Sequence, residues 1–151
     1  MRFFIAGIMQ GSLTQAEIQP QEYRETVRNL LLQTFPRADV YDPLADHHHS
    51  IDYDDDTGRD TFFGHNRMCR EVDCVIAFAP EASMGTAIEM WEAFRSGKTV
   101  ITISPLLHNW VIKFCSHLIF ESIQQFEDAL TDGTVKQHLD THSYSIDPRV
   151  V

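Results

Sequence analysis

A stretch rich in small residues, Pro80 to Glu92, follows the most apolar segment of the chain and could form a ligand-binding turn. Ser83, Gly85 and Thr86 lie where a strand is expected to pass into a helix. Small side chains let a ligand approach the backbone, and the N–H groups at a helix N-terminus favour a phosphate or another anion. Neither a Walker A ending nor GxGxxG is present, which disfavours a nucleoside-triphosphate loop or a dinucleotide site. The alternative is that these residues only allow close packing of helix on strand.

Glu89 is the residue of this stretch whose side chain could carry out a reaction. It lies within the first two turns of the expected helix, beside the apolar residues Ile88, Met90 and Trp91. A carboxylate at the ligand end of a strand could act as a nucleophile at a sugar carbon. The alternative is a solvated helix glutamate, and Glu92, three residues further on, has the same two interpretations.

Three consecutive histidines, His47 to His49, lie in an acidic stretch that runs from Asp46 to Asp56. Adjacent histidines do not converge easily on one ion, and no HExxH or EF-hand pattern is present, so we expect neither a metal nor a cofactor. We interpret the stretch as a solvated loop that could serve as a lid beside a substrate. A Ser-His-Asp triad is disfavoured too, because Ser83 lies in no GxSxG turn.

Short apolar runs alternate with helical spacing, and this alternation would position the residues above. We expect five strands, over residues 2–7, 38–41, 74–79, 99–104 and 118–120, and helices around 23–35, 62–71, 83–97, 110–116 and 126–130. Residues 44–58 are expected to form a long loop, and a polar tail is expected from about 136. Strands that alternate with helices predict a single domain with one parallel α/β sheet covered by helices on both faces, flavodoxin-like or Rossmann-like. In such sheets the ligand lies beyond the carboxyl ends of the strands.

Length and charge limit the classes of function. The chain has 151 residues, enough for one core, and a formal net charge of -10. Without a basic run it is not expected to bind long nucleic acid or an anionic membrane, whereas a small ligand remains possible. Residues 39–60 hold eight acids and only Arg59, so most of the negative charge is local. Cys69, Cys74 and Cys115 form no CxxC pair and predict buried thiols in a cytoplasmic protein.

Three blocks, residues 4–7, 81–89 and 97–101, resemble the nucleoside 2-deoxyribosyltransferase family, whose relatives include nucleoside 5′-phosphate N-hydrolases. The resemblance covers residues 2–120 and implies a five-stranded parallel sheet, usually in a homodimer or larger oligomer. It also implies cleavage of an N-glycosidic bond through a glycosyl-enzyme ester. Glu89 matches the glutamate nucleophile of the family, and Ser83 matches the serine that holds a 5′-phosphate.

The resemblance also implies the remaining site residues. Gly85 and Thr86 would line the sugar-phosphate pocket, and the end of the first strand and its loop would contact the substrate through Gly7, Gln10, Gly11 and Ser12. The serine and arginine that hold phosphate in the phosphohydrolase branch are replaced here by Ile8 and Gln10, so a nucleoside is as plausible a substrate as a monophosphate.

The family's general acid has no direct match. An aspartate is usual eight residues before the acidic residue that opens the third strand, and here that position holds His65. A histidine can act as an acid near neutral pH, and Asp60 is the alternative if the helix is shifted. Asn109 matches a residue that reaches the neighbouring subunit's phosphate. The expected function is therefore N-glycosidic cleavage or transfer on a nucleoside or nucleotide, and the alternative is an inactive nucleotide-binding sensor with the same pocket.

Overall fold

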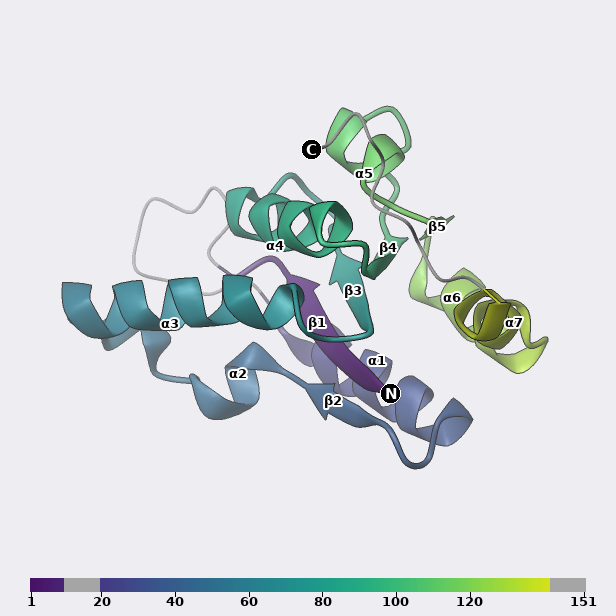
Figure 1. Cartoon of the computed structure of the whole chain (residues 1–151), viewed down its shortest axis with the longest axis horizontal. Helices are drawn as coiled ribbons and strands as arrows, with labels where there is room; N and C mark the ends of the chain where they lie inside the picture. Colours follow the sequence, from purple (N-terminus) through teal and green to yellow (C-terminus); the bar gives the residue numbers. More distant parts are fainter. Residues whose placement is uncertain (10–19, 142–151) are drawn as a thin grey trace.

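The computed structural model describes residues 1–9 and 20–141 and has at its centre a five-stranded, all-parallel sheet. The strands run in the order β2-β1-β3-β4-β5 (Figure 1). Their bounds are Arg2–Gly7 for β1, Asp39–Tyr41 for β2, Cys74–Phe78 for β3, Thr99–Ile103 for β4 and Leu118–Phe120 for β5. All five strands expected from the apolar runs are confirmed, two of them to the residue.

Helices connect the strands and cover both faces of the sheet. They are α1 (Glu22–Thr34), α2 (Pro43–Asp46), α3 (Asp55–Cys69), α4 (Met84–Arg95), α5 (Trp110–Phe114), α6 (Ile123–Thr131) and α7 (Thr134–Thr141). Helices α3 and α4 lie side by side over one face, and α6 and α7 lie together at the far end of the sheet (Figure 1). The expected parallel α/β fold is therefore confirmed.

Alternation along the strands divides the core in two. In β1, Phe3 and Ile5 pack with α1, α6 and α7, whereas Phe4 and Ala6 face the opposite way, towards α3, α4 and α5. Each of these four side chains is at most 1% exposed. A strand that is buried on both faces must be apolar at every position, which explains the uninterrupted run from Phe3 to Ala6.

The strand order places a topological switch point between β1 and β3. From β1 the chain moves outward to β2, then returns across β1 to β3 and continues outward in the other direction. The two strands pair in parallel as far as Gly7 and Phe78, so their carboxyl ends lie together. The connections that leave these ends diverge, and the resulting crevice is where ligands bind in open α/β sheets.

The polar stretch from 44 to 58 was expected to be a loop, and this expectation is wrong. Helix α2, a 3-10 turn at Ser50–Asp52 and the first turn of α3 occupy most of it. Aspartates begin both helices: Asp42 accepts a hydrogen bond from Leu44 N at 3.0 Å, and Asp54 accepts one from Thr57 N at 2.8 Å. Acidic residues in this stretch thus act as helix N-caps, which a charge count alone does not distinguish from a solvated run.

The expected polar tail from about 136 is likewise part helix. Helix α7 extends to Thr141, and Val135 at its start is 0% exposed within the core that also includes Phe126. The three cysteines are buried and form no disulfide, as expected. Within residues 1–9 and 20–141, no helix combines the length and apolar character needed to cross a bilayer.

Gly7 lies against Tyr23 of α1, and this contact predicts an intolerance to any side chain. A Cβ built on Gly7 would fall 2.1 Å from the Tyr23 hydroxyl oxygen, in a region where Tyr23 is only 8% exposed. We expect Gly7→Ala to lower the free energy of unfolding by about 1–3 kcal/mol, measured by urea denaturation, because the buried ring must move.

Gly64→Ala is the matched control. Gly64 lies inside α3, where a Cβ would approach only Arg67 Nη2, at 3.9 Å. This variant should be neutral or gain up to about 1 kcal/mol, since alanine is the better helix former. Equal stability of Gly7→Ala and wild type would contradict the packing described here.

Candidate active site

A cavity of about 390 Å³ opens at the switch point, beyond the carboxyl ends of β1 and β3. Its volume is in the usual range for small-molecule sites. Its walls come from the end of β1, from α1, from α2, from the segment that leads into α3, from α3 and from the first half of α4. The lining residues are Gly7, Met9, Arg24, Pro43, His47, Ser50, Ile51, Tyr53, Gly58, Thr61, Phe62, His65, Ser83, Met84, Gly85, Thr86 and Glu89.

Six residues predicted from the sequence line this one cavity: Gly7, His65, Ser83, Gly85, Thr86 and Glu89. Two do not. Asp60 lies exposed on α3, and Asn109 caps α5, where its Oδ1 accepts from Val111 N at 2.9 Å. Asn109 lines a neighbouring cavity of about 240 Å³, which shares Ser83, Met84 and Thr86 with the first. The predicted residues Gln10, Gly11 and Ser12 lie outside the described part of the chain.

Glu89 lies on α4, more than one turn after the helix begins, with a partly buried side chain in the cavity wall. Burial raises the pKa of its carboxyl to about 8, against the opposing effect of the Arg24 guanidinium. At neutral pH the carboxyl is therefore mostly protonated. A carboxyl with this pKa is close to its ionised form, and loss of one proton would give a carboxylate that can act as a nucleophile.

Ser83 begins helix α4 and shapes the adjacent wall. Its Oγ accepts hydrogen bonds from Thr86 N at 3.4 Å and from Thr86 Oγ1 at 3.1 Å. Ser83 is thus the N-cap of α4, which explains why the helix begins directly after it. It also directs the positive end of the α4 dipole towards the cavity, where a developing or fixed negative charge would be stabilised.

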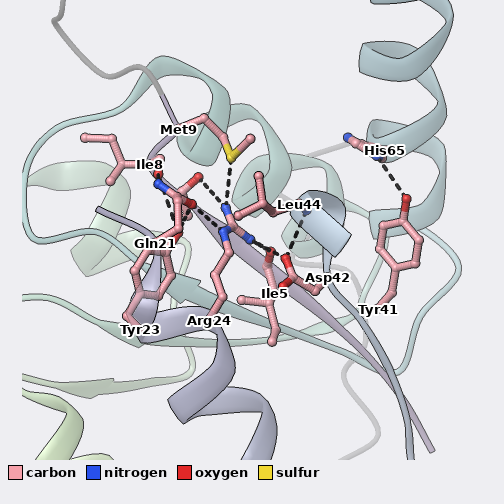
Figure 2. Close-up of polar contacts among 11 residues, drawn as sticks. Ile5, Ile8, Met9, Gln21, Tyr23, Arg24, Tyr41, Asp42, Leu44 and His65 are labelled. Atoms are coloured by element: carbon pink, nitrogen blue, oxygen red, sulfur yellow. Dashed lines mark hydrogen bonds and ion pairs between the residues drawn. The ribbon is translucent and has the colours of Figure 1, made fainter. Parts of the chain in front are cut away.

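Arg24 forms the floor of the cavity and is 2% exposed. Its guanidinium donates to Ile5 O at 3.0 Å, Gly7 O at 3.2 Å and Met9 Sδ at 3.4 Å. It also donates to Gln21 Oε1 at 2.6 Å and forms an ion pair with Asp42 Oδ1 at 3.0 Å. Figure 2 shows these contacts converging on one side chain. All five N–H groups are thereby used, so Arg24 organises the site and is not a spare cation for a ligand.

The helical spacing of α1 could have identified Arg24 as a buried residue. It precedes Val27 by three residues and Leu31 by seven, so all three lie on the same helical face, and all three are buried. A basic residue on an apolar face is most often interpreted as solvated. Here the carbonyl oxygens at the end of β1 and the carboxylate of Asp42 compensate for burial of the charge.

His65 contributes a neutral imidazole to the wall. Its Nε2 is 3.1 Å from the hydroxyl oxygen of Tyr41, as Figure 2 shows, and its ring packs edge-on against Phe4. Burial, the nearby His47 and the Arg24 guanidinium lower the pKa of His65 to about 4. At neutral pH this residue can offer a substrate a hydrogen bond, and it holds no spare proton.

His47 is the residue of the histidine triplet that reaches the cavity, and the sequence did not distinguish it from its neighbours. It follows α2 directly and lines the wall, whereas His48 and His49 are exposed and do not line it. Among the described residues no cluster of three His, Cys, Asp or Glu side chains could hold a metal ion.

The raised pKa of Glu89 predicts a stability that depends on pH. Because the folded-state value of about 8 exceeds the ordinary value of 4.5, the unfolded chain releases this proton first as pH rises. Stability is therefore lost between pH 4.5 and 8, and Glu89→Gln, which cannot ionise, should remove that loss. We expect the variant to match wild type at pH 4.5 and to exceed it by a few kcal/mol at pH 8, measured by urea denaturation.

Glu92→Gln is the matched control, one turn along the same helix. Although burial raises the pKa of Glu92, hydrogen bonds from Arg95 and Arg70 lower it overall. Its contribution to stability is present above the ordinary pKa and lost in acid, so this substitution should destabilise the protein at neutral pH and not at low pH. The same pH trend for both variants would contradict the assigned electrostatics.

Comparison with known proteins gives structural and not sequence relatives. No family model and no curated protein matches the chain. A 2-deoxyribosyltransferase from the psychrotolerant bacterium Bacillus psychrosaccharolyticus superimposes with a TM-score of 0.64 at 16% identity, covering 85% of this chain and 91% of that one. A CMP N-glycosidase from Clostridium botulinum superimposes with a TM-score of 0.52 at 19% identity, covering 87% of this chain and 98% of that one.

These similarities span most of all three chains, and they confirm the predicted resemblance at the level of the fold. The chain has the parallel α/β fold of a nucleoside 2-deoxyribosyltransferase.

Proposed function

We propose that this protein breaks the N-glycosidic bond of a nucleoside or nucleoside 5′-monophosphate, with Glu89 as the nucleophile. The observation that carries the proposal is the Glu89 carboxyl itself, which lines the cavity at the switch point with a pKa raised to about 8. Its place in the second turn of α4 agrees with the resemblance of residues 81–89 to the deoxyribosyltransferase family. Two structural neighbours, a deoxyribosyltransferase and a CMP N-glycosidase, act on bonds of this kind.

The proposed reaction has two displacements at one carbon. An oxygen of ionised Glu89 attacks the anomeric carbon, the bond from that carbon to the base nitrogen breaks, and its electron pair leaves with the base. The sugar then remains on Glu89 as an ester. Water, or the nitrogen of a second base, attacks the same carbon and releases the carboxylate. A carboxylate also stabilises the positive charge that develops on the sugar ring, as it does in retaining glycosidases.

The rest of the cavity would hold the sugar. Ser83 retains a hydroxyl hydrogen to donate, because its Oγ accepts both contacts from Thr86. Gly85 exposes backbone to the cavity, and a Cβ built on it would meet nothing within 4 Å. These groups and the start of α4 would contact the sugar hydroxyls or a 5′-phosphate.

A homodimer and a cytoplasmic location belong to the same proposal. Helices α4 and α5 leave large apolar side chains exposed, with Met84 at 83%, Trp110 at 77% and Phe114 at 57%. Apolar surface of this kind favours an interface with a second copy. Three reduced, buried cysteines are typical of a reducing compartment.

Release of free base from a substrate panel tests the proposed activity. We expect the wild type to release base from at least one deoxyribonucleoside, ribonucleoside or 5′-monophosphate, followed by liquid chromatography. Glu89→Gln should lower the rate by at least 10³-fold, since the nucleophile itself is removed. A 2-fluoro-sugar substrate should leave a covalent adduct on the peptide that contains Glu89, detected by mass spectrometry.

Glu92→Gln is the control for this assay, because Glu92 is engaged by Arg70 and Arg95 and does not line the cavity. It should keep the wild-type rate. If ligands from the panel raise the Tm of the wild type and none is cleaved, the protein is the inactive sensor. If Glu89→Gln keeps full activity, the nucleophile is another residue.

The rate should depend on pH through Glu89. Because attack requires the carboxylate and the pKa is about 8, kcat/KM for a substrate whose base leaves without protonation should rise close to tenfold per pH unit between pH 6 and 7 and level off above pH 8. Initial rates in constant-ionic-strength buffers measure this profile. A profile that is flat from pH 5 to 8 would mean that the carboxyl is already ionised at the start of catalysis.

A further inference from the structure

Four aromatic side chains from separate elements form one wall of the cavity region. Tyr41 ends β2, His47 follows α2, Tyr53 follows the 3-10 turn, and His65 lies on α3. His47, Tyr53 and His65 line the cavity directly, and Tyr41 stands behind His65. Four separate elements thus bring together a pair of imidazoles, and both imidazoles line the same cavity as Glu89.

Each imidazole is held through one nitrogen by a tyrosine. Nδ1 of His47 is 2.9 Å from the Tyr53 hydroxyl, and Nε2 of His65 is 3.1 Å from the Tyr41 hydroxyl. The two imidazole rings meet edge to face, with centroids 5.1 Å apart. Across residues 1–9 and 20–141, no hydrogen bond engages Nε2 of His47, so this nitrogen is available to a substrate.

The surroundings of His65 disfavour a positive charge on its ring. Two imidazoles in contact accommodate one positive charge at most, because a second is repelled by the first. Burial, His47 and Arg24 all disfavour charge on His65, and Asp46 is the nearby carboxylate that favours charge in this region. Tyr41 and Tyr53 hold the two imidazoles through their hydroxyl groups. His65 is therefore disfavoured as the acid, and His47 is the imidazole of the pair that keeps a nitrogen for the substrate.

We propose that His47 protonates the departing nucleobase, and that His65, Tyr41 and Tyr53 are positioning residues that hold its ring. This inference rests on the proposed function and assigns to a different element the acid that the sequence placed at His65 or Asp60. His47 has the required geometry: its Nδ1 is fixed by Tyr53, and its other nitrogen remains for the substrate.

The proton and electron balance is complete within the site, because the proton that leaves the Glu89 carboxyl before attack is the one that His47 carries to the base. As Glu89 attacks the anomeric carbon, the electrons of the carbon–nitrogen bond pass to the base, and the Nε2 proton of His47 imidazolium neutralises it. His47 is left neutral, with its Nδ1 hydrogen still donated to Tyr53, so the ring need not turn. When water resolves the ester on Glu89, it releases one proton, and His47 takes it up to restore the starting state.

A comparison of leaving groups tests this role. The probes are the purine nucleoside that wild type cleaves best and its N7-methylated form, whose cationic base leaves without protonation; for a pyrimidine enzyme they are deoxyuridine and 5-fluorodeoxyuridine, whose base leaves more readily. We expect His47→Ala to lower kcat/KM by 10²–10⁴-fold on the unmodified nucleoside and by less than tenfold on the N7-methylated one, with a smaller contrast between the pyrimidines. Added imidazole should restore part of the lost rate. Tyr53→Phe should show the same selectivity to a smaller degree.

His48→Ala and His49→Ala are matched controls, since both residues are exposed neighbours in the same triplet. Each should stay within twofold of wild type on both substrates. Equal losses for His47→Ala on both members of the pair, with no imidazole rescue, would overturn the role of His47 while leaving the proposed function intact. Absence of base release by wild type from every substrate would instead overturn the proposed function itself.

Discussion

The site depends on one buried cation. Arg24 enters from α1 and binds the carbonyl oxygens of Ile5 and Gly7, so it fixes the end of β1 at the cavity floor. Its ion pair with Asp42 fixes the start of α2, because the same Asp42 oxygen caps that helix. His47 follows α2 directly. One guanidinium thereby connects the end of β1, the N-cap of α2 and, through α2, His47. Losing one partner of such a buried pair is costly, because the other charge is left uncompensated.

The same cation also limits how far Glu89 departs from ordinary behaviour. Desolvation favours the neutral carboxyl, and the positive charge of Arg24 favours the ionised one, with a pKa of about 8 as the result. His65 is affected in the opposite way, since burial and Arg24 both disfavour its charged form. Glu89 and His65 are consequently both close to uncharged at neutral pH. Neutral Glu89 and His65 avoid the cost of burying further charges beside the Arg24–Asp42 ion pair.

The acidic character of residues 39–60 has a structural explanation that a charge count conceals. Asp42 and Asp54 cap helices, and hydrogen bonds from Thr57 lower the pKa of Asp54. Asp55 and Asp56 follow in the first turn of α3, where the helix dipole favours negative charge. These acids therefore order the segment that forms one side of the cavity. The interpretation as a solvated lid missed this because capping is recognised only when the following residues are known to be helical.

The sequence by itself determined the sheet and the position of Glu89. Apolar runs such as Phe3 to Ala6 must be strands buried on both faces, and the small residues before Glu89 must begin a helix at a strand end, because both patterns are local in the chain. Tertiary structure alone decided which polar side chains meet there. Arg24 and His47 join Glu89 through contacts between distant segments, such as Arg24 with Asp42 and His47 with His65. Local periodicity carries no record of such pairings, since burial of a charge or a choice among adjacent histidines depends on what another part of the chain places opposite it.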